Sequence, residues 1–337
     1  MTRDAAEPIA IPALEASSGS SASTAPDTDF AIRTVDVRVD YNDVAAVQGL
    51  NLQIGWGEVY GLVGPNGAGK TSTFGVLSTL RRPTFGEAYV AGHETVEHPS
   101  QARAAVGYMP DQSPVHDDLK CWEFLDLFAG SYGLRGADRK KRVDECLARV
   151  DLTGKRNAMA GTLSRGMTQR LVLAKTLLHD PRVLLLDEPA SGLDPHARKD
   201  LRDLLLDLRE LGKTIVISSH ILAELADFCS SVGVMQQGRL LVSGPIDELT
   251  AKLAPRRRWS VRVVGPVAPL LGFLEAREDW QAVLEPGGVE VSTDQNEAHA
   301  ARLLAELIAA GLPVCEFTER RATMQDVVFG ISSGAVA

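Results

Sequence analysis

Short apolar runs alternate with longer stretches of helical period between residues 30 and 252. Residues 59–63, 183–186 and 214–217 are apolar runs of strand length, which is typical of strands buried on both faces of a sheet. Between 201 and 208, leucines recur at i, i+3, i+4 and i+7, the spacing of one helix face. Buried strands that alternate with amphipathic helices predict a mostly parallel sheet covered by helices.

A different pattern fills about residues 115–165, where helical period continues without a strong strand signal. Val143, Cys146, Leu147 and Val150 again follow the spacing of a helix face. This stretch therefore predicts an all-helical insert within the α/β body.

The N-terminal segment differs from this body in composition. Residues 1–28 are rich in Ala, Ser, Thr and Pro. Such a segment buries too little apolar area to offset the entropy of ordering it, so it predicts a disordered tail.

The C-terminal segment also changes pattern. A basic run at 256–258 precedes an alternating strand, after which the order β-α-β-β-α-β ends in a strand near 314–317 and a short final helix. That order resembles a split βαβ module. We therefore expect an α/β domain over 29–252 and a small α+β domain over 254–337.

Composition and charge narrow the classes of partner. The chain of 337 residues has 35 basic and 44 acidic residues, a formal charge of −9, which argues against nucleic acid as a partner. No run approaches the ~18–20 apolar residues of a membrane-spanning helix, and the N-terminus lacks an apolar signal core. Four widely spaced cysteines predict core thiols in a reducing compartment.

A glycine-rich loop directly after the strand at 59–63 carries the clearest chemistry. It matches the pattern GxxxxGK[ST] at every fixed position and is followed by Ser72; its residues are Gly64, Pro65, Asn66, Gly67, Ala68, Gly69, Lys70 and Thr71. Glycines let successive N–H groups converge on phosphates, while the Lys70 ammonium reaches the terminal phosphates and the Thr71 hydroxyl ligates Mg²⁺. A predicted helix over about 70–80 directs its positive end at the same anion. The loop predicts binding of a nucleoside triphosphate.

Two other predicted strands end in polar residues. Asp187 and Glu188 follow the strand at 183–186, where an α/β sheet places ligand chemistry. Asp187 is expected to hold Mg²⁺, and Glu188 to polarise an attacking water as a general base. His220 ends the strand that begins at 214; it either orients that water or has a structural role.

These motifs together resemble the ATP-binding cassette, the motor subunit of ABC transporters, over about residues 30–250. Residues 163–170 read LSRGMTQR and are similar to the family signature LSGGQ-x-QR. Residues 187–189 and 191–194 resemble the Walker B and D-loop pair, and His220 matches the switch histidine. Tyr41 lies where the family has an aromatic residue that stacks on adenine, although a structural role for a lone tyrosine is equally compatible.

The resemblance implies a P-loop NTPase fold of the ABC-cassette type: a mixed sheet with helices and an all-helical subdomain. It also implies that two cassettes dimerise head to tail, with ATP and Mg²⁺ between the glycine-rich loop of one and the signature of the other. Ser164, Arg165 and Gly166 are the signature residues expected to act across that interface, Ser164 through its hydroxyl and Gly166 through its N–H. One chain alone is then expected to hydrolyse ATP poorly.

Two departures from the family pattern affect turnover more than binding. Arg165 and Met167 stand where the family has Gly and Gln. The family's Q-loop glutamine is replaced by Asp111, with Gln112 beside it, and either residue is a candidate for the Q-loop role near Mg²⁺.

A motor without a membrane span implies a separate integral-membrane permease and a position on the inner face of the cell membrane. A single cassette with a short C-terminal domain is most similar to subunits of bacterial multidrug or antibiotic exporters. Trp122, Phe124 and Phe128 either line the groove for that permease or pack the helical insert. The run 256–259 either touches anionic lipid or is a solvated boundary. The alternatives are a soluble cassette ATPase that acts on chromosomes or ribosomes, and a regulatory cassette that only binds nucleotide.

Overall fold

The fold is described from a computed structural model, which covers residues 29–226, 228–253, 257–277, 279–293 and 295–320. These residues form two compact units that divide between residues 246 and 247. The predicted N-terminal tail, Arg256 and the predicted final helix lie outside the described residues.

The first unit contains an antiparallel sheet that the sequence patterns did not predict. Its strand order is β2-β1-β4-β5. The strands are β1 (Ile32–Tyr41), β2 (Val44–Ile54), β4 (Phe85–Val90) and β5 (His93–Glu94). Several shifts in register interrupt the pairing of β1 with β2 and β4, which explains why their hydrophobic alternation is irregular.

The second sheet of this unit is the expected one. Its strand order is β10-β9-β3-β8-β7-β6, with parallel pairing except between β9 and β10. The strands are β3 (Val59–Val63), β6 (Val106–Met109), β7 (Val183–Leu186), β8 (Thr214–Ser219), β9 (Ser231–Gln236) and β10 (Arg239–Pro245). Every residue of β3, β7 and β8 is buried, as their apolar runs predicted. The carboxyl ends of these three parallel strands therefore share one edge of the sheet.

Helices complete the core around the two sheets. They are α1 (Lys70–Leu77), α2 (Pro99–Ala105), α6 (Pro195–Glu210) and α7 (Leu222–Ala226). Helix α8 (Ile246–Leu253) begins at the division and belongs, from Asp247 on, to the second unit. Phe74 and Leu77 of α1 join a core cluster with residues of both sheets. The helix ends earlier than expected, because Thr79 follows with a left-handed φ of 61°. The four leucines of α6 are buried, as their spacing predicted.

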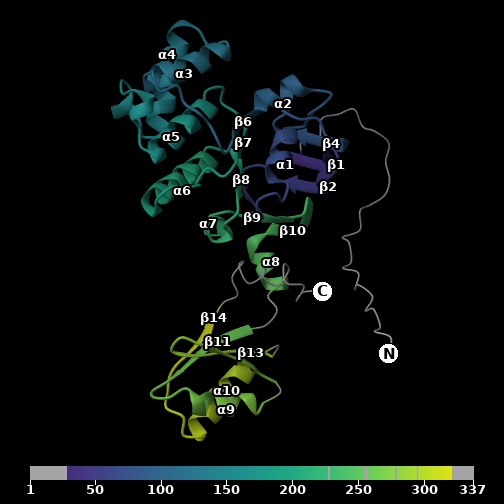
Figure 1. The fold of residues 1–337 in the computed structure, drawn as a ribbon, viewed down its shortest axis with the longest axis vertical. Coiled ribbons are helices and arrows are strands. Elements are labelled where there is room, and N and C mark those ends of the chain that lie inside the picture. The colour runs from purple at the N-terminus through teal and green to yellow at the C-terminus, as the bar shows by residue number, and fades with distance from the viewer. Residues whose placement is uncertain (1–28, 227, 254–256, 278, 294, 321–337) are drawn as a thin grey trace. The chain divides into compact units, whose positions relative to one another are not determined.

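The stretch after β6 is helical and groups apart from the antiparallel sheet (Figure 1). It contains α3 (Cys121–Ser131), α4 (Gly136–Arg149), two 3₁₀ turns (Thr153–Lys155 and Ala160–Thr162) and α5 (Arg165–Thr176). Phe124 is only 1% exposed, so the proposal that it lines a groove is wrong; it packs edge-on against Phe128 inside the helical group. Trp122 is half-buried beneath Arg156.

The second unit has the predicted order β-α-β-β-α-β. Its elements are β11 (Arg257–Val263), α9 (Ala268–Glu275), β12 (Gln281–Glu285), β13 (Gly288–Thr293), α10 (Glu297–Ala309) and β14 (Val314–Arg320). The strands form an antiparallel sheet in the order β12-β13-β11-β14. Trp259 and Trp280 meet edge to face at 5.6 Å in its core.

The basic run at the start of this unit is part of its sheet. Arg257 pairs with Glu297 at 3.1 Å, and Arg258 pairs with Glu290 at 3.5 Å. These ion pairs agree with the solvated-boundary interpretation better than with a cationic patch for lipid, because carboxylates accompany both guanidinium groups.

Two further sequence expectations concern thiols and membrane spans. Cys121, Cys146 and Cys229 are buried free thiols, whereas Cys315 is exposed on β14, so the core-thiol prediction is wrong for that residue. No helix among the described residues is long and apolar enough to cross a membrane.

Candidate nucleotide site

A cleft of about 740 Å³ opens at the edge where the parallel strands end. Its lining combines residues of β1 and β2, the glycine-rich loop, the start of α1 and two carboxylates. The residues relevant here are Tyr41, Asn66, Gly67, Ala68, Gly69, Lys70, Thr71, Ser72, Asp111 and Glu188. Of the other predicted residues, Gly64, Pro65, Gln112, Asp187 and His220 do not line it.

The loop backbone requires glycine at positions the motif fixes. Gly69 has a φ of 105°, and a Cβ there would collide with the carbonyl oxygen of Ala46. A Cβ at Gly64 would collide with the carbonyl oxygen of Met235. The chain can therefore pass close to β2 and β9 and deliver its N–H groups to one concave surface.

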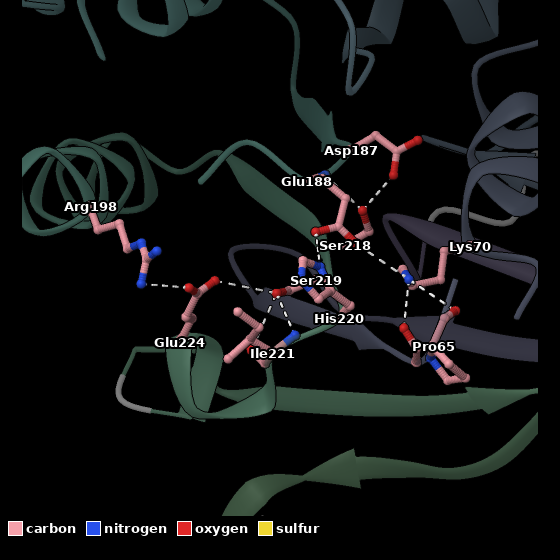
Figure 2. Close-up of polar contacts among 11 residues, drawn as sticks. Pro65, Lys70, Asp187, Glu188, Arg198, Ser218, Ser219, His220, Ile221 and Glu224 are labelled. Atoms are coloured by element: carbon pink, nitrogen blue, oxygen red, sulfur yellow. Dashed lines mark hydrogen bonds and ion pairs between the residues drawn. The ribbon is translucent and has the colours of Figure 1, made fainter. Parts of the chain in front are cut away.

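Lys70 is held at the base of the cleft and is only 6% exposed. Its Nζ donates to the carbonyl oxygen of Gly64 at 2.6 Å and lies 3.4 Å from the carbonyl oxygen of Pro65. The same atom lies 3.4 Å from Oε1 of Glu188, as Figure 2 shows. A buried ammonium surrounded by oxygen atoms is positioned to exchange them for phosphate oxygens.

Glu188 adopts an unusual backbone conformation, with a φ of 48°. Its N–H donates to Oγ of Ser218 at 2.9 Å, and its carbonyl oxygen accepts from the Ser191 N–H at 3.0 Å. Its Oε2 lies 2.9 Å from Nδ1 of His220. These contacts hold the side chain between a lysine and a histidine, so that strand ends β7 and β8 jointly position one carboxylate.

Asp187 is almost completely buried, with 1% exposure. Its Oδ1 accepts a hydrogen bond of 2.5 Å from Oγ of Ser218, whereas its Oδ2 has no hydrogen-bond partner among the described residues. A buried carboxylate oxygen without a partner is costly unless a cation or a water completes it. Together with the Thr71 hydroxyl in the cleft lining, this donor set fits a hard cation such as Mg²⁺.

Tyr108 of β6 reports on the carboxylates around it. Burial, together with the negative charges of Asp187 and Asp111, raises its pKa to about 12. The phenol therefore stays protonated beside the two carboxylates.

A polar chain fixes the loop that follows β8. Oγ of Ser219 accepts from the Ile221 N–H at 2.9 Å and lies 3.5 Å from Glu224, which in turn pairs with Arg198 of α6 at 2.9 Å (Figure 2). These contacts hold Ser219 and Ile221, the residues on either side of His220. Because Glu224 also pairs with Arg198, helix α6 helps to keep His220 oriented toward Glu188.

Comparisons with known proteins agree with this geometry. The ABC transporter family profile matches residues 47–191. The chain is 35% identical over 285 residues to the ABC transporter ATP-binding protein all4389 of Nostoc, covering 81% of this chain and 82% of that protein. The chain belongs to the ABC transporter ATP-binding proteins. It is therefore an ATPase of the kind that couples ATP hydrolysis to transport.

Other relatives of this ABC protein carry more specific names. It is 33% identical to the daunorubicin resistance ATP-binding protein DrrA3 of Streptomyces coeruleorubidus, covering 89% of this chain and 95% of that protein. The probable multidrug protein YbhF of Escherichia coli is 34% identical over 66% of this chain, but the match spans only 38% of YbhF.

Solved structures of ABC cassettes share the fold. The cbiO1 subunit from Clostridium perfringens superimposes with a TM-score of 0.62 at 27% identity, over 66% of this chain and 92% of that chain. The dimeric structure of MJ0796, a bacterial ABC transporter cassette, has a TM-score of 0.58 at 28% identity, over 64% and 98% of the two chains. The predicted ABC-cassette fold is thus confirmed.

The signature residues of this ABC protein are not part of the cleft. Ser164 is the N-cap of α5 and accepts from the Met167 N–H at 3.4 Å, while Arg165 and Gly166 begin the helix. None of the three lines the cleft that holds Lys70. A single chain therefore presents the two halves of the expected ATP site separately, and their meeting across a dimer stays a prediction.

Tyr41 occupies the mouth of the cleft and is 41% exposed. Its hydroxyl lies 3.3 Å from Oγ of Ser72, and the guanidinium of Arg81 covers one ring face at 4.0 Å from the centroid. Stacking of adenine on Tyr41, which stays a prediction, would use the opposite ring face or displace Arg81.

Sequence reasoning missed two residues of the site. Ser218 bridges Asp187 and Glu188, and its only signal was its position one residue from the end of an apolar strand. Arg81 left no signal, since the cation–π contact joins the loop after α1 to Tyr41 at the end of β1, forty residues away in sequence.

Proposed function

We propose that this chain is the ATP-hydrolysing motor subunit of an ABC exporter, and that it works as a head-to-tail dimer bound to a separate integral-membrane permease. The observation that carries the proposal is the cluster of Lys70, Glu188 and His220 at the mouth of three parallel strands. An ion pair of 3.4 Å links the glutamate to Lys70, and a hydrogen-bond distance of 2.9 Å links it to Nδ1 of His220.

In this proposal each residue of the cluster has its own role in ATP hydrolysis. Lys70 neutralises charge on the β- and γ-phosphates, and His220 donates a hydrogen bond that orients the water or the γ-phosphate. Glu188 accepts the proton as the water oxygen bonds to the γ-phosphorus, and the bond to the bridging oxygen breaks to release ADP and phosphate.

Asp187, Thr71 and Asp111 would hold Mg²⁺ in this site, Asp111 in place of the family's Q-loop glutamine. The cation supplies charge stabilisation to the phosphate oxygens when it is bound. The unpartnered Oδ2 of Asp187 supports this assignment, and the position of Asp111 in the cleft lining favours it over Gln112 for the Q-loop role.

The dimer and the permease rest on the family. The signature residues Ser164, Arg165 and Gly166 would act on the nucleotide of the second copy, and their position outside the cleft of their own chain supports this. The names of DrrA3 and YbhF support export of a drug-like substrate. The protein would then lie in the cytoplasm on the inner face of the cell membrane, through its permease.

The variant Glu188→Gln tests this assignment. It preserves side-chain size but removes the proton acceptor, so we expect ATP binding to persist, ATPase activity to fall about 100-fold, and ATP to trap a dimer. Fluorescent-nucleotide titration, phosphate release and size-exclusion chromatography with light scattering measure the three properties. Glu210→Gln, an exposed carboxylate at the end of α6, is the matched control.

Equal ATPase rates in wild type and Glu188→Gln would refute the base assignment. A variant that binds ATP but remains monomeric would refute the head-to-tail arrangement. The permease is tested separately, by asking whether the chain co-purifies with the membrane protein encoded in the adjacent reading frame and drives ATP-dependent uptake of a dye into inverted vesicles.

A further inference from the structure

The arginine that departs from the family signature lies against the D-loop of its own chain. A Cβ built on Gly192 would approach Nη1 and Nη2 of Arg165 to 2.6 Å, and Cζ more closely still. The guanidinium therefore covers the Cα of Gly192, whose φ of 67° already requires glycine. No ion pair of Arg165 with a carboxylate is present within the part of the chain described.

The rest of the signature helix start packs on the same region. A Cβ on Gly166 would lie 3.2 Å from Cβ of Ala197, at the first turn of α6, and 4.0 Å from Cδ2 of Leu193. One turn further along α5, Arg170 pairs with Asp200 of α6. The beginnings of α5 and α6 are therefore joined at several points, of which Arg165 is the one nearest the tip of the D-loop.

The D-loop, residues 191–194, is in turn joined to Glu188. The Ser191 N–H donates to the carbonyl oxygen of Glu188 at 3.0 Å. At its other end Asp194 caps α6, accepting from the N–H groups of His196 and Ala197 at 3.0 Å. Ser191, whose N–H holds the backbone of Glu188, directly precedes the Gly192 that Arg165 covers.

We infer that Arg165 is a positioning residue that couples the signature helix to Glu188 of the same chain through Gly192. The inference rests on the proposed function, because the signature engages nucleotide only in the proposed dimer. Closure of the signature on the partner's ATP then presses the planar guanidinium on the D-loop and sets the catalytic carboxylate of its own site. The two ATP sites of the dimer are linked by this contact.

The planarity of the guanidinium distinguishes this role from a contact of Arg165 with phosphate in trans. A flat cation can cover a glycine backbone, whereas the compact ammonium of lysine cannot, although it serves phosphate as a point charge. If Arg165 positions the D-loop, Arg165→Lys and Arg165→Met should both lower kcat about tenfold and change KM for ATP less than twofold. ATPase assays on the full chain measure both constants.

Substitution at Gly192 provides the second arm of the test. Gly192→Ala introduces the methyl group that Arg165 excludes, so we expect the same loss of kcat. Gly212→Ala is the matched control, because Gly212 has a comparable φ of 82° but no atom within 4 Å of its built Cβ. The combined Arg165→Met and Gly192→Ala variant should lose little more than either single variant, since both break one contact.

The possible outcomes distinguish failure of the inference about Arg165 from failure of the proposed function. Recovery of activity by Arg165→Lys together with a raised KM in Arg165→Met would assign Arg165 to phosphate and overturn the inference. Wild-type kcat in Arg165→Met, or additive losses in the double variant, would also overturn it. Combined with Glu188→Gln, Arg165→Met should still dimerise on ATP. If Glu188→Gln alone fails to dimerise, the proposed function fails instead.

Discussion

The two units of the molecule differ in how many buried polar atoms they leave without a partner, although both contain ion pairs. In the first unit, buried oxygen or nitrogen atoms of Asp187, Glu188 and His179 have no hydrogen-bond partner among the described residues. In the second unit, charged groups neutralise one another: Arg262 pairs with Glu316, and Arg320 with Glu285 and Glu290. Two of the unpartnered atoms, Oδ2 of Asp187 and Oε1 of Glu188, belong to the candidate nucleotide site, whereas those of Thr95, Arg139, His179 and Arg198 lie elsewhere in the first unit. A ligand can complete the first two.

The comparison also separates loops from regular strands. The groups of the nucleotide site come from loops at strand ends and include Glu188 in a left-handed conformation. The second unit uses regular antiparallel register, interrupted only near Arg262. Strain and unpaired polarity thus mark the functional unit, as expected of sites that trade stability for chemistry.

Among the tests of this difference between the units, we expect the largest loss of ATPase activity from a substitution of Lys70. Lys70→Ala removes the buried ammonium from the cleft and should lower ATPase activity at least about 100-fold, because phosphate charge is then no longer neutralised. Phosphate release and nucleotide titration measure the loss. Lys199→Ala removes an exposed lysine of α6 as the control and should leave both unchanged. Undiminished hydrolysis in Lys70→Ala would mean that the cleft is not the ATP site.

The next effect concerns the core of the second unit. Trp280→Ala removes a side chain that is 5% exposed and packs on Trp259, so we expect a loss of about 3–5 kcal/mol in the free energy of unfolding of that unit. Urea unfolding followed by circular dichroism measures it. Val283→Ala, 60% exposed on β12, is the control. ATP affinity should stay unchanged; a weakened affinity would contradict the division between the units.

A smaller effect follows from His179 in the first unit. Burial lowers the pKa of His179 from its ordinary value of 6.5, so the folded chain keeps it neutral where the unfolded chain binds a proton. The unfolded state then holds more protons below about pH 6.5, and the free energy of unfolding falls as the pH is lowered through that value. Its ring N–H is also committed to the Val106 carbonyl at 2.8 Å.

His179→Gln tests this linkage, because glutamine can donate the same hydrogen bond without titrating. Urea midpoints between pH 7.5 and pH 5.5 should shift less in the variant than in the wild type. His98→Gln, an exposed histidine, should retain the wild-type slope. An unchanged slope in His179→Gln would show that other groups carry the acid sensitivity.

The smallest expected difference between the units concerns the reactivity of their cysteine thiols, and it does not involve a change in stability. Cys315 is exposed in the second unit, whereas burial raises the pKa of Cys146 to about 11 and of Cys229 to about 12 in the first. A thiol reagent should therefore label one cysteine in the native chain, because the thiolate is the reactive form. Mass spectrometry after brief labelling identifies it, and Cys315→Ser should abolish the signal. Rapid labelling of Cys229 would contradict its burial.

Sequence reasoning found the elements whose pattern is local. The apolar runs of β3, β7 and β8 and the glycine-rich loop are contiguous, so their residues predict both the strands and the chemistry at the strand ends. The order of elements in the second unit was equally readable from alternation and turn residues.

What the sequence could not supply are contacts between distant segments and irregular backbone. The shifts of register in β1 hide its alternation, and the left-handed φ of Glu188 has no signature in residue type. The meeting of Arg165 with Gly192 depends on the packing of α5 against α6. Asp111 and Gln112 are neighbours in sequence, and only the fold distinguishes them, by placing Asp111 in the cleft lining.

The free border of β12 has a practical consequence for anyone who handles this protein. Among the described residues β12 pairs only with β13, in a regular register, and Val283 and Leu284 are 60% and 62% exposed. An unguarded apolar strand border is a template for intermolecular pairing. Concentrated samples should therefore tend to self-associate there, and a lysine introduced at position 283 should improve solubility and crystallisation behaviour while leaving the fold intact.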